Sequence, residues 1–151
     1  MFDIRLGVPS DVEFIMSLER EALALPWPEE SVNNLLALSD GGNSFAFAAV
    51  CPEVGYIGVT GVLDEAEIGN LVVAPQWRGK GAGTALLTYV FDELKRRSVS
   101  VVFLEVESTN KPAMSLYLKS GFVEYGRRDD YYGTGRDAVL MKKELLILKI
   151  L

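Results

Sequence analysis

Two spacings of hydrophobic residues alternate along the chain, and together they predict its secondary structure. Runs of apolar and β-branched residues predict seven strands, at about residues 2–6, 44–50, 54–63, 67–73, 99–106, 122–127 and 138–143. Apolar residues three and four positions apart predict four helices, at about residues 10–22, 28–38, 81–97 and 110–120. This order predicts a mixed α/β fold in which one sheet is flanked by helices.

Polar residues and glycine mark where two of these helices begin and end. Ser10 and Glu13 have the spacing of a capping box, so we expect the first helix to begin there. Asn110 precedes the last predicted helix, where its side chain can cap the first turn, and Gly121 follows the end of that helix.

The length of 151 residues suits one domain, of which 49% is hydrophobic and 24% charged. We place the domain at residues 1–143 and describe 144–151 as an apolar C-terminal extension, for which packing on a second copy is an open hypothesis. No apolar run approaches the ~20 residues that cross a bilayer, and the first residues lack a signal peptide. We therefore expect a cytoplasmic protein with no membrane partner.

Three features of the composition limit the chemistry. The chain has no histidine and a single cysteine, Cys51, which excludes histidine triads and most zinc sites, so no metal is expected. The net charge of −6 disfavours a nucleic-acid partner. Acid–base chemistry must then come from Asp, Glu, Tyr, Lys, Cys or an ordered water.

A glycine-rich turn separates the predicted strand 67–73 from the helix that follows. Gly79, Gly81 and Gly83 allow several backbone N–H groups to point one way, and the helix adds its positive end, which suits a phosphate or diphosphate. The turn lacks the Gly-Lys-Ser/Thr triplet of a P-loop and the G-x-G-x-x-G spacing of a dinucleotide site. A plain glycine-rich turn remains the alternative.

The segment Arg78-Gly79-Lys80-Gly81-Ala82-Gly83 resembles the Arg/Gln-x-x-Gly-x-Gly/Ala signature of the GNAT superfamily of N-acetyltransferases. The resemblance implies the GNAT fold, a mostly antiparallel sheet of six or seven strands with four helices, and acetyl-CoA as co-substrate. It also implies that the main chain of Leu71, Val72 and Val73 pairs with the pantetheine arm. The coenzyme A diphosphate would be held by the amides of Arg78, Gly79, Lys80, Gly81, Ala82, Gly83 and Thr84.

Glu105 is a carboxylate in an otherwise hydrophobic strand, on the same face as Val101 and Phe103 by strand alternation. If both faces of the sheet are buried, desolvation raises its pKa and favours a role as a base. The alternative is that the strand simply ends there and Glu105 is solvated. Tyr117, in the last helix, either packs beside its helical neighbours or directs its hydroxyl toward the strand.

A wider set of segments resembles the bacterial ribosomal-protein-alanine N-acetyltransferases of the RimI type and covers almost the whole chain in order. These segments are 25–27, 63–66, 104–106, 110, 116–122, 131–132 and 137–141. By position, the resemblance makes Glu105 the general base, Tyr117 the general acid and Asn110 a coenzyme A contact. It also places Trp27 and Tyr132 beside the acceptor, although two partly buried aromatic residues are an equal alternative.

The acceptor implied is the N-terminal amine of a protein, the N-terminal alanine of a small-subunit ribosomal protein. An α-amine has a pKa of ~7.7–8.0, so a modest base suffices for direct transfer. Glu65 and Glu67 remain alternative bases, while Cys51 has no base near it in sequence. Other functions stay open: acetylation of a small-molecule amine or a lysine, acyl-CoA sensing without catalysis, and generic nucleotide binding.

Overall fold

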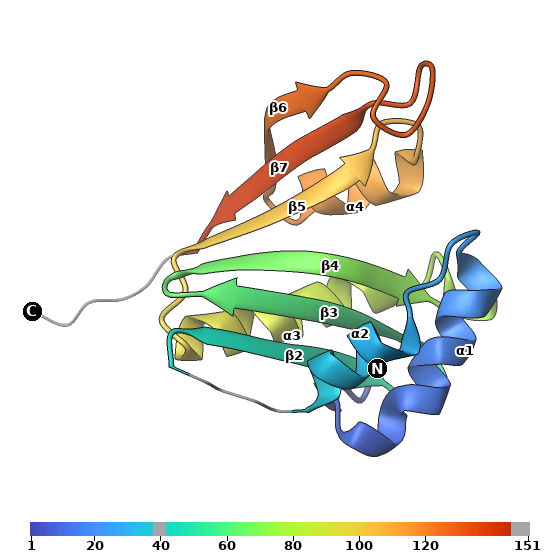
Figure 1. Ribbon diagram of the computed structural model, residues 1–151, viewed down its shortest axis with the longest axis vertical. Coiled ribbons are helices and arrows are strands. Elements are labelled where there is room, and N and C mark those ends of the chain that lie inside the picture. The colour runs from blue at the N-terminus through green and yellow to red at the C-terminus, as the bar shows by residue number, and fades with distance from the viewer. Residues whose placement is uncertain (38–41, 146–151) are drawn as a thin grey trace, which may run out of the picture.

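One seven-stranded sheet, in the order β1-β2-β3-β4-β5-β7-β6, runs through the molecule in this computed structural model, which describes residues 1–37 and 42–145 (Figure 1). The strands are β1 (Arg5–Leu6), β2 (Ser44–Cys51), β3 (Gly55–Val62), β4 (Glu65–Val73), β5 (Val101–Glu107), β6 (Val123–Arg128) and β7 (Ala138–Glu144). Neighbouring strands are antiparallel except β4 and β5, which are parallel. The predicted mixed, mostly antiparallel sheet is confirmed.

In the part of the chain that the structure describes, four α-helices cover the two faces of the sheet: α1 (Val12–Ala22), α2 (Glu29–Leu36), α3 (Ala82–Arg96) and α4 (Lys111–Lys119). Helices α1 and α2 share one buried cluster with strand residues such as Tyr56 and Val72. Helices α3 and α4 share the other cluster, with residues such as Ile68 and Leu104. We call these the α1/α2 face and the α3/α4 face. All eleven predicted elements are present in the predicted order, with ends shifted by a few residues.

Strand β4 contains a β-bulge that changes which side chains face each layer. Ile57 lies opposite Leu71 and Val59 opposite Ile68, so Gly69 and Asn70 together oppose one residue of β3. Before the bulge the even-numbered side chains belong to the α3/α4 face, and after it they belong to the α1/α2 face.

The bulge coincides with the divergence of β4 from β5, which is visible in Figure 1. The two strands pair only from Glu65 opposite Val101 to Glu67 opposite Phe103. A bulge bends and twists its strand, so beyond Glu67 the two strands separate toward their C-terminal ends. This divergence provides the space in which the candidate site lies.

The ends of the helices agree with the expectations in one case and differ in another. Asn110 caps α4 as expected, accepting a hydrogen bond from the Ala113 amide at 3.2 Å, and Gly121 follows the helix with φ of +96°. The expected capping box of Ser10 and Glu13 is wrong. Asp11 accepts instead from the Val8 amide at 2.8 Å and from Arg5, because a 3-10 turn precedes the α-helix.

The C-terminal region is described only in part. Strand β7 runs to Glu144, and Leu145 is buried, whereas residues 146–151 of the predicted extension lie outside the described residues. Within 1–37 and 42–145, no helix combines the length and the apolar character needed to cross a membrane.

Candidate active site

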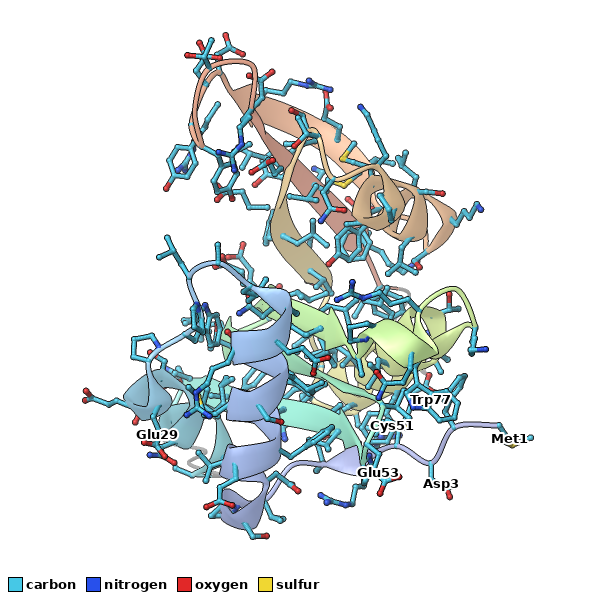
Figure 2. The ribbon with its side chains drawn as sticks, turned by 90° about the vertical axis from the view of Figure 1, so that its right-hand side faces the viewer. Met1, Asp3, Glu29, Cys51, Glu53 and Trp77 are labelled. Carbon is cyan, nitrogen blue, oxygen red and sulfur yellow. The ribbon has the colours of Figure 1, made fainter. Side chains whose placement is uncertain are left out.

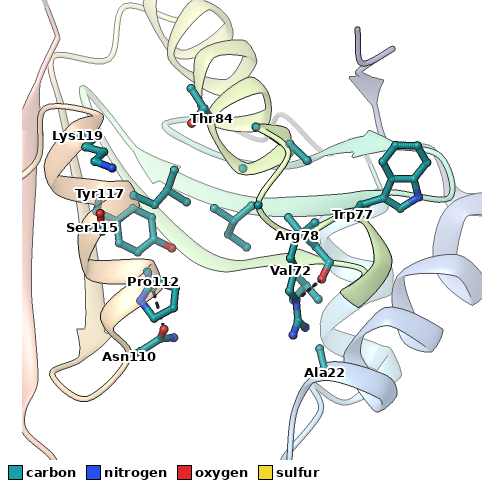
Figure 3. Close-up of a pocket in the computed structure, with 18 of the residues that line it drawn as sticks. Ala22, Val72, Trp77, Arg78, Thr84, Asn110, Pro112, Ser115, Tyr117 and Lys119 are labelled. Carbon is teal, nitrogen blue, oxygen red and sulfur yellow. Dashed lines mark hydrogen bonds between the residues drawn. The ribbon is translucent and has the colours of Figure 1, made fainter.

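A cavity of about 610 Å³ opens where β4 and β5 diverge, between the start of α3 and helix α4 (Figure 3). It brings together most of the predicted cofactor residues. Its lining includes Leu71, Val72, Val73, Arg78, Gly79, Gly81, Ala82, Gly83, Thr84, Asn110 and Tyr117. Of the predicted cofactor residues, Lys80 is absent from this lining. Residues 71–84 and residues 110–117, which are apart in the sequence, therefore meet in one cavity.

The glycine turn has the geometry that an anion site requires. Gly79 and Gly81 have φ of +73° and +90°, and a Cβ on either would meet no atom within 4 Å. Left-handed backbone at both positions allows neighbouring N–H groups to point the same way, both glycines line the cavity, and α3 begins directly afterwards at Ala82. The partial positive charge of a fifteen-residue helix therefore points at the turn.

The wall formed by β4 offers main-chain groups to a ligand. Because pairing with β5 covers only Glu65–Glu67, the backbone of Leu71–Val73 has no strand partner on the cavity side in the described part of the chain. Arg78 turns back over this strand and donates from Nε to the Val73 carbonyl at 3.0 Å. The ring of Trp77 packs edge-on against Phe2, with centroids 6.2 Å apart, beside the N-terminal segment (Figure 2).

Helix α4 supplies the opposite wall and directs Tyr117 into the cavity (Figure 3). The side chain is 8% exposed and packs edge-on against Phe122, with centroids 5.7 Å apart. The ring of Tyr117 therefore packs in the core while its hydroxyl faces the cavity. Burial raises the pKa of this phenol to about 12, so it remains protonated at neutral pH.

Glu105 points to the other face of the sheet. In β5 the side chains of Val102, Leu104 and Val106 are buried on the α3/α4 face, which places Glu105 on the α1/α2 side. The expectation of a carboxylate buried among hydrocarbon is wrong, because its side chain is 29% exposed and the buried cluster of the α1/α2 face includes no residue of β5. The alternative of a strand ending there is also wrong, since β5 continues to Glu107.

The neighbours of Glu105 define a second cavity, of about 340 Å³, which Glu67 and Arg128 also line. Tyr132 donates from its hydroxyl to Glu105 Oε2 at 3.3 Å, and Arg128 lies 3.7 Å from Oε1. Burial, and then the charge of Glu105, raise the pKa of Tyr132, which keeps it a donor. The structure therefore brings Tyr132 and Glu105 together.

Glu107 shares this side of β5 but is engaged more tightly. Arg136 donates to its Oε1 at 2.6 Å and Thr109 to its Oε2, and these two bonds, that from Arg136 first, lower its pKa. Of the two glutamates, Glu105 has the weaker cationic contact. It is accordingly the more available proton acceptor.

Trp27 lines neither cavity but packs on β4, the strand next to that of Glu105. Its ring covers Gly69, where a Cβ would come within 2.5 Å of the indole. Continuing the parallel register of β4 and β5, Gly69 is level with Glu105, and both positions face the α1/α2 side. Trp27 therefore sits across the diverging strands from Glu105.

A buried polar network was missed by the sequence analysis. Glu19, fully buried in α1, accepts hydrogen bonds from the Trp27 amide at 2.8 Å, the Tyr56 hydroxyl at 2.5 Å and the Asn70 side-chain amide at 2.9 Å. Burial, and then the bond to Glu19, raise the pKa of Tyr56 well above its usual range. The available signal was a charged residue four positions after Ile15, on the apolar stripe of the helix.

Two further groups bear on the chemistry. Cys51 is buried, and desolvation raises the pKa of its thiol, which disfavours a role as a nucleophile. Among residues 1–37 and 42–145, no cluster of three or more Cys, Asp or Glu side chains is arranged to hold a metal ion.

The sequence model of the acetyltransferase (GNAT) family matches residues 12–122, which include the glycine turn, Glu105 and Tyr117. The chain belongs to the GNAT family. It is 35% identical over 142 residues to the ribosomal protein bS18-alanine N-acetyltransferase of Escherichia coli, covering 87% of this chain and 90% of the relative. The corresponding protein of Haemophilus ducreyi is 30% identical over 145 residues, with 89% and 94% covered.

Solved GNAT structures share the fold. The crystal structure of the Escherichia coli ribosomal-protein-S18-alanine N-acetyltransferase superposes with a TM-score of 0.81 at 30% identity, over 99% of this chain and 97% of that one. Arabidopsis thaliana NAA60 in complex with acetyl-CoA superposes with a TM-score of 0.79 at 22% identity, over 96% and 99%. This GNAT protein is therefore an N-acetyltransferase by family and by fold.

Proposed function

We propose that this protein transfers the acetyl group of acetyl-CoA to the N-terminal α-amine of a protein, the N-terminal alanine of a small-subunit ribosomal protein, in the cytoplasm. One observation carries the proposal. The glycine turn and Tyr117 lie on the α3/α4 face of the divergence between β4 and β5, while Glu105 lies on the other face. Two substrates can therefore meet from opposite sides of the sheet.

The larger cavity fits acetyl-CoA in its chemistry. The left-handed glycines and the start of α3 suit its diphosphate, and the unpaired edge of Leu71–Val73 suits the amide groups of its pantetheine arm. Asn110 uses its Oδ1 to cap α4, so its NH₂ group remains as a donor to the ligand.

Glu105 is proposed to accept the proton of the incoming ammonium, directly or through a water. At pH 7 roughly a tenth of an α-amine is already neutral but under a thousandth of a lysine side chain, so a partly exposed carboxylate is adequate for the former. The amine then attacks the thioester, while an N–H of the Leu71–Val73 strand stabilises the carbonyl oxygen. Glu67 lines the same cavity and stays the alternative base, whereas Glu65 lines neither cavity.

Tyr117 is proposed to protonate the departing thiolate, and its replacement is expected to have a moderate effect. Since a thiol has a pKa near 8.5, the thiolate is a fair leaving group, and Tyr117→Phe should lower kcat about tenfold at pH 7. The deficit should shrink toward pH 9. With a pKa of about 12, Tyr117 should cause no loss of wild-type kcat up to pH 10. Pre-steady-state rates measured across this pH range check this, with Tyr89→Phe on α3 as the control. A kcat of Tyr117→Phe equal to that of the wild type argues against the role of Tyr117.

Mass spectrometry of the products tests the acceptor. The protein is incubated with acetyl-CoA and peptides that differ only in their first two residues, each carrying one internal lysine. Acetylation should fall on the α-amine and be fastest for N-terminal alanine. Modification of the lysine alone, or of a polyamine in preference to every peptide, would replace the proposed acceptor. Coenzyme A binding with no turnover on any amine would indicate a sensor instead.

A further inference from the structure

Glu19 has no role in the proposed chemistry, yet it is one of the most completely buried side chains of the molecule. Burying a carboxylate is costly unless donors compensate for the lost water. Here the three donors come from three separate segments: the Trp27 main chain between α1 and α2, Tyr56 on β3, and Asn70 on β4. Glu19 therefore joins the α1–α2 connection to the middle of the sheet.

Two of these segments lead directly to the site. Asn70 is a bulge residue, and the next residue along β4, Leu71, lines the larger cavity. The α1–α2 connection touches both sides of the divergence, because Leu23 lines the larger cavity while the Trp27 ring covers Gly69 on the side of Glu105. The position of this connection thus affects the proposed acceptor side of the site.

The sequence around Trp27 makes the hydrogen bond from its main-chain N–H to Glu19 unusually important. Pro26 and Pro28 flank Trp27 and have no N–H, so the Trp27 amide is the one main-chain donor of residues 26–28. Leu25, before the prolines, is 89% exposed and contributes little packing. The connection is therefore held near Trp27 by the indole on Gly69 and by this hydrogen bond at 2.8 Å.

We propose that Glu19 is a positioning residue, which fixes the Trp27 segment on the bulge of β4 and so preforms the binding surface for the acceptor peptide. The inference rests on the proposed function for the identity of the acceptor. Without this carboxylate the connection would sample several positions, and the acceptor would bind only to the fraction in the right one. Loss of the Glu19 carboxylate should therefore weaken the binding of the acceptor and leave the rate of the chemical step unchanged.

The first experiment compares wild type with Glu19→Met, a side chain of similar length without acceptors. The Trp27 amide, followed by NMR hydrogen exchange, should be protected in the wild type and exchange at least about tenfold faster in the variant. In steady-state assays the KM for the peptide should rise about tenfold, with kcat and the KM for acetyl-CoA within about twofold of wild type. A merely structural role would lower the melting temperature without this division between KM and kcat.

Asp11→Ala is the matched control. Asp11 is also a buried carboxylate on the N-terminal helical segment that accepts from a main-chain amide, that of Val8, but it lies at the far end of α1 from Trp27. It should lose stability while the peptide KM and the Trp27 exchange rate remain at wild-type values.

Glu19→Met also removes the acceptor of the buried Tyr56 hydroxyl, which can prevent folding. The double variant Glu19→Met/Tyr56→Phe removes that hydroxyl and should fold, while still lacking the acceptor for Trp27. Unchanged peptide KM in either folded variant, or a wild-type Trp27 amide that exchanges as fast as that of exposed Leu25, overturns the proposal. If the wild type acetylates no peptide, the proposed function fails, and the exchange rates still decide whether Glu19 anchors the segment.

Discussion

Glu105→Gln should lower kcat by about 10²–10³-fold at pH 7, with KM for acetyl-CoA nearly unchanged. The variant preserves the size of the side chain and its contact with Tyr132 but cannot take a proton from the ammonium. The deficit should narrow at pH 9, because an α-amine with a pKa of ~7.7–8.0 is then already mostly neutral. Single-turnover rates at saturating acetyl-CoA and peptide, measured at both pH values, test this.

Glu107→Gln provides a matched control for this result. Glu107 lies on the same side of β5, two residues further on, and the change disrupts its bond with Arg136 while leaving Glu105 in place. We expect kcat within about threefold of wild type. Full kcat in Glu105→Gln, together with a large loss in Glu67→Gln, would transfer the role of base to the neighbouring strand.

The second large effect is expected from Gly81→Asp, which should weaken coenzyme A binding about a hundredfold. Like charges ~4 Å apart near a protein surface repel by on the order of 4 kcal/mol before salt screening, and the new carboxylate would face the diphosphate. Aspartate tolerates left-handed backbone better than most residues, so the φ of +90° at this position should still allow folding. Isothermal titration calorimetry with coenzyme A, at low and high salt, measures the effect and its electrostatic part.

Gly42→Asp separates this electrostatic effect from backbone strain. Gly42 has a similar φ of +65°, a Cβ there would meet no atom within 4 Å, and it precedes β2, outside both cavities. Its variant should lose comparable stability and bind coenzyme A as wild type does. Equal affinity in both variants would mean that the diphosphate does not lie at the glycine turn.

The sequence predicted the elements well because their signals are local. Hydrophobic spacing, the cap at Asn110 and the glycines of residues 79–83 each depend on a few neighbouring residues, and the structure confirms the elements they predict. The predicted burial of Glu105 was wrong for a non-local reason. Whether a face of β5 is covered depends on where α1 and α2 pack, and these helices pack over β2, β3 and β4.

The Glu19 network shows the same limit more strongly. Its donors lie at positions 27, 56 and 70, and the pairing with Asn70 depends on a bulge whose position only the strand register reveals. Local patterns indicated a polar residue on an apolar stripe but could not supply its partners. The residues most dependent on tertiary register were thus the ones that sequence spacing could not place.

The bulge at Gly69 and Asn70 makes the count of residues in β4 as important as their identity. Removing one residue there would restore regular pairing with β3 and leave Leu71 and Val73 on the α3/α4 face, but the strand would lose the bend that accompanies its separation from β5. The chain could still form its sheet, yet acetyl-CoA and the acceptor amine would no longer have an opening between β4 and β5 in which to meet. Substitutions in this stretch can therefore accumulate while its length stays fixed, so a shortened copy of the gene would encode a folded protein unable to join its two substrates.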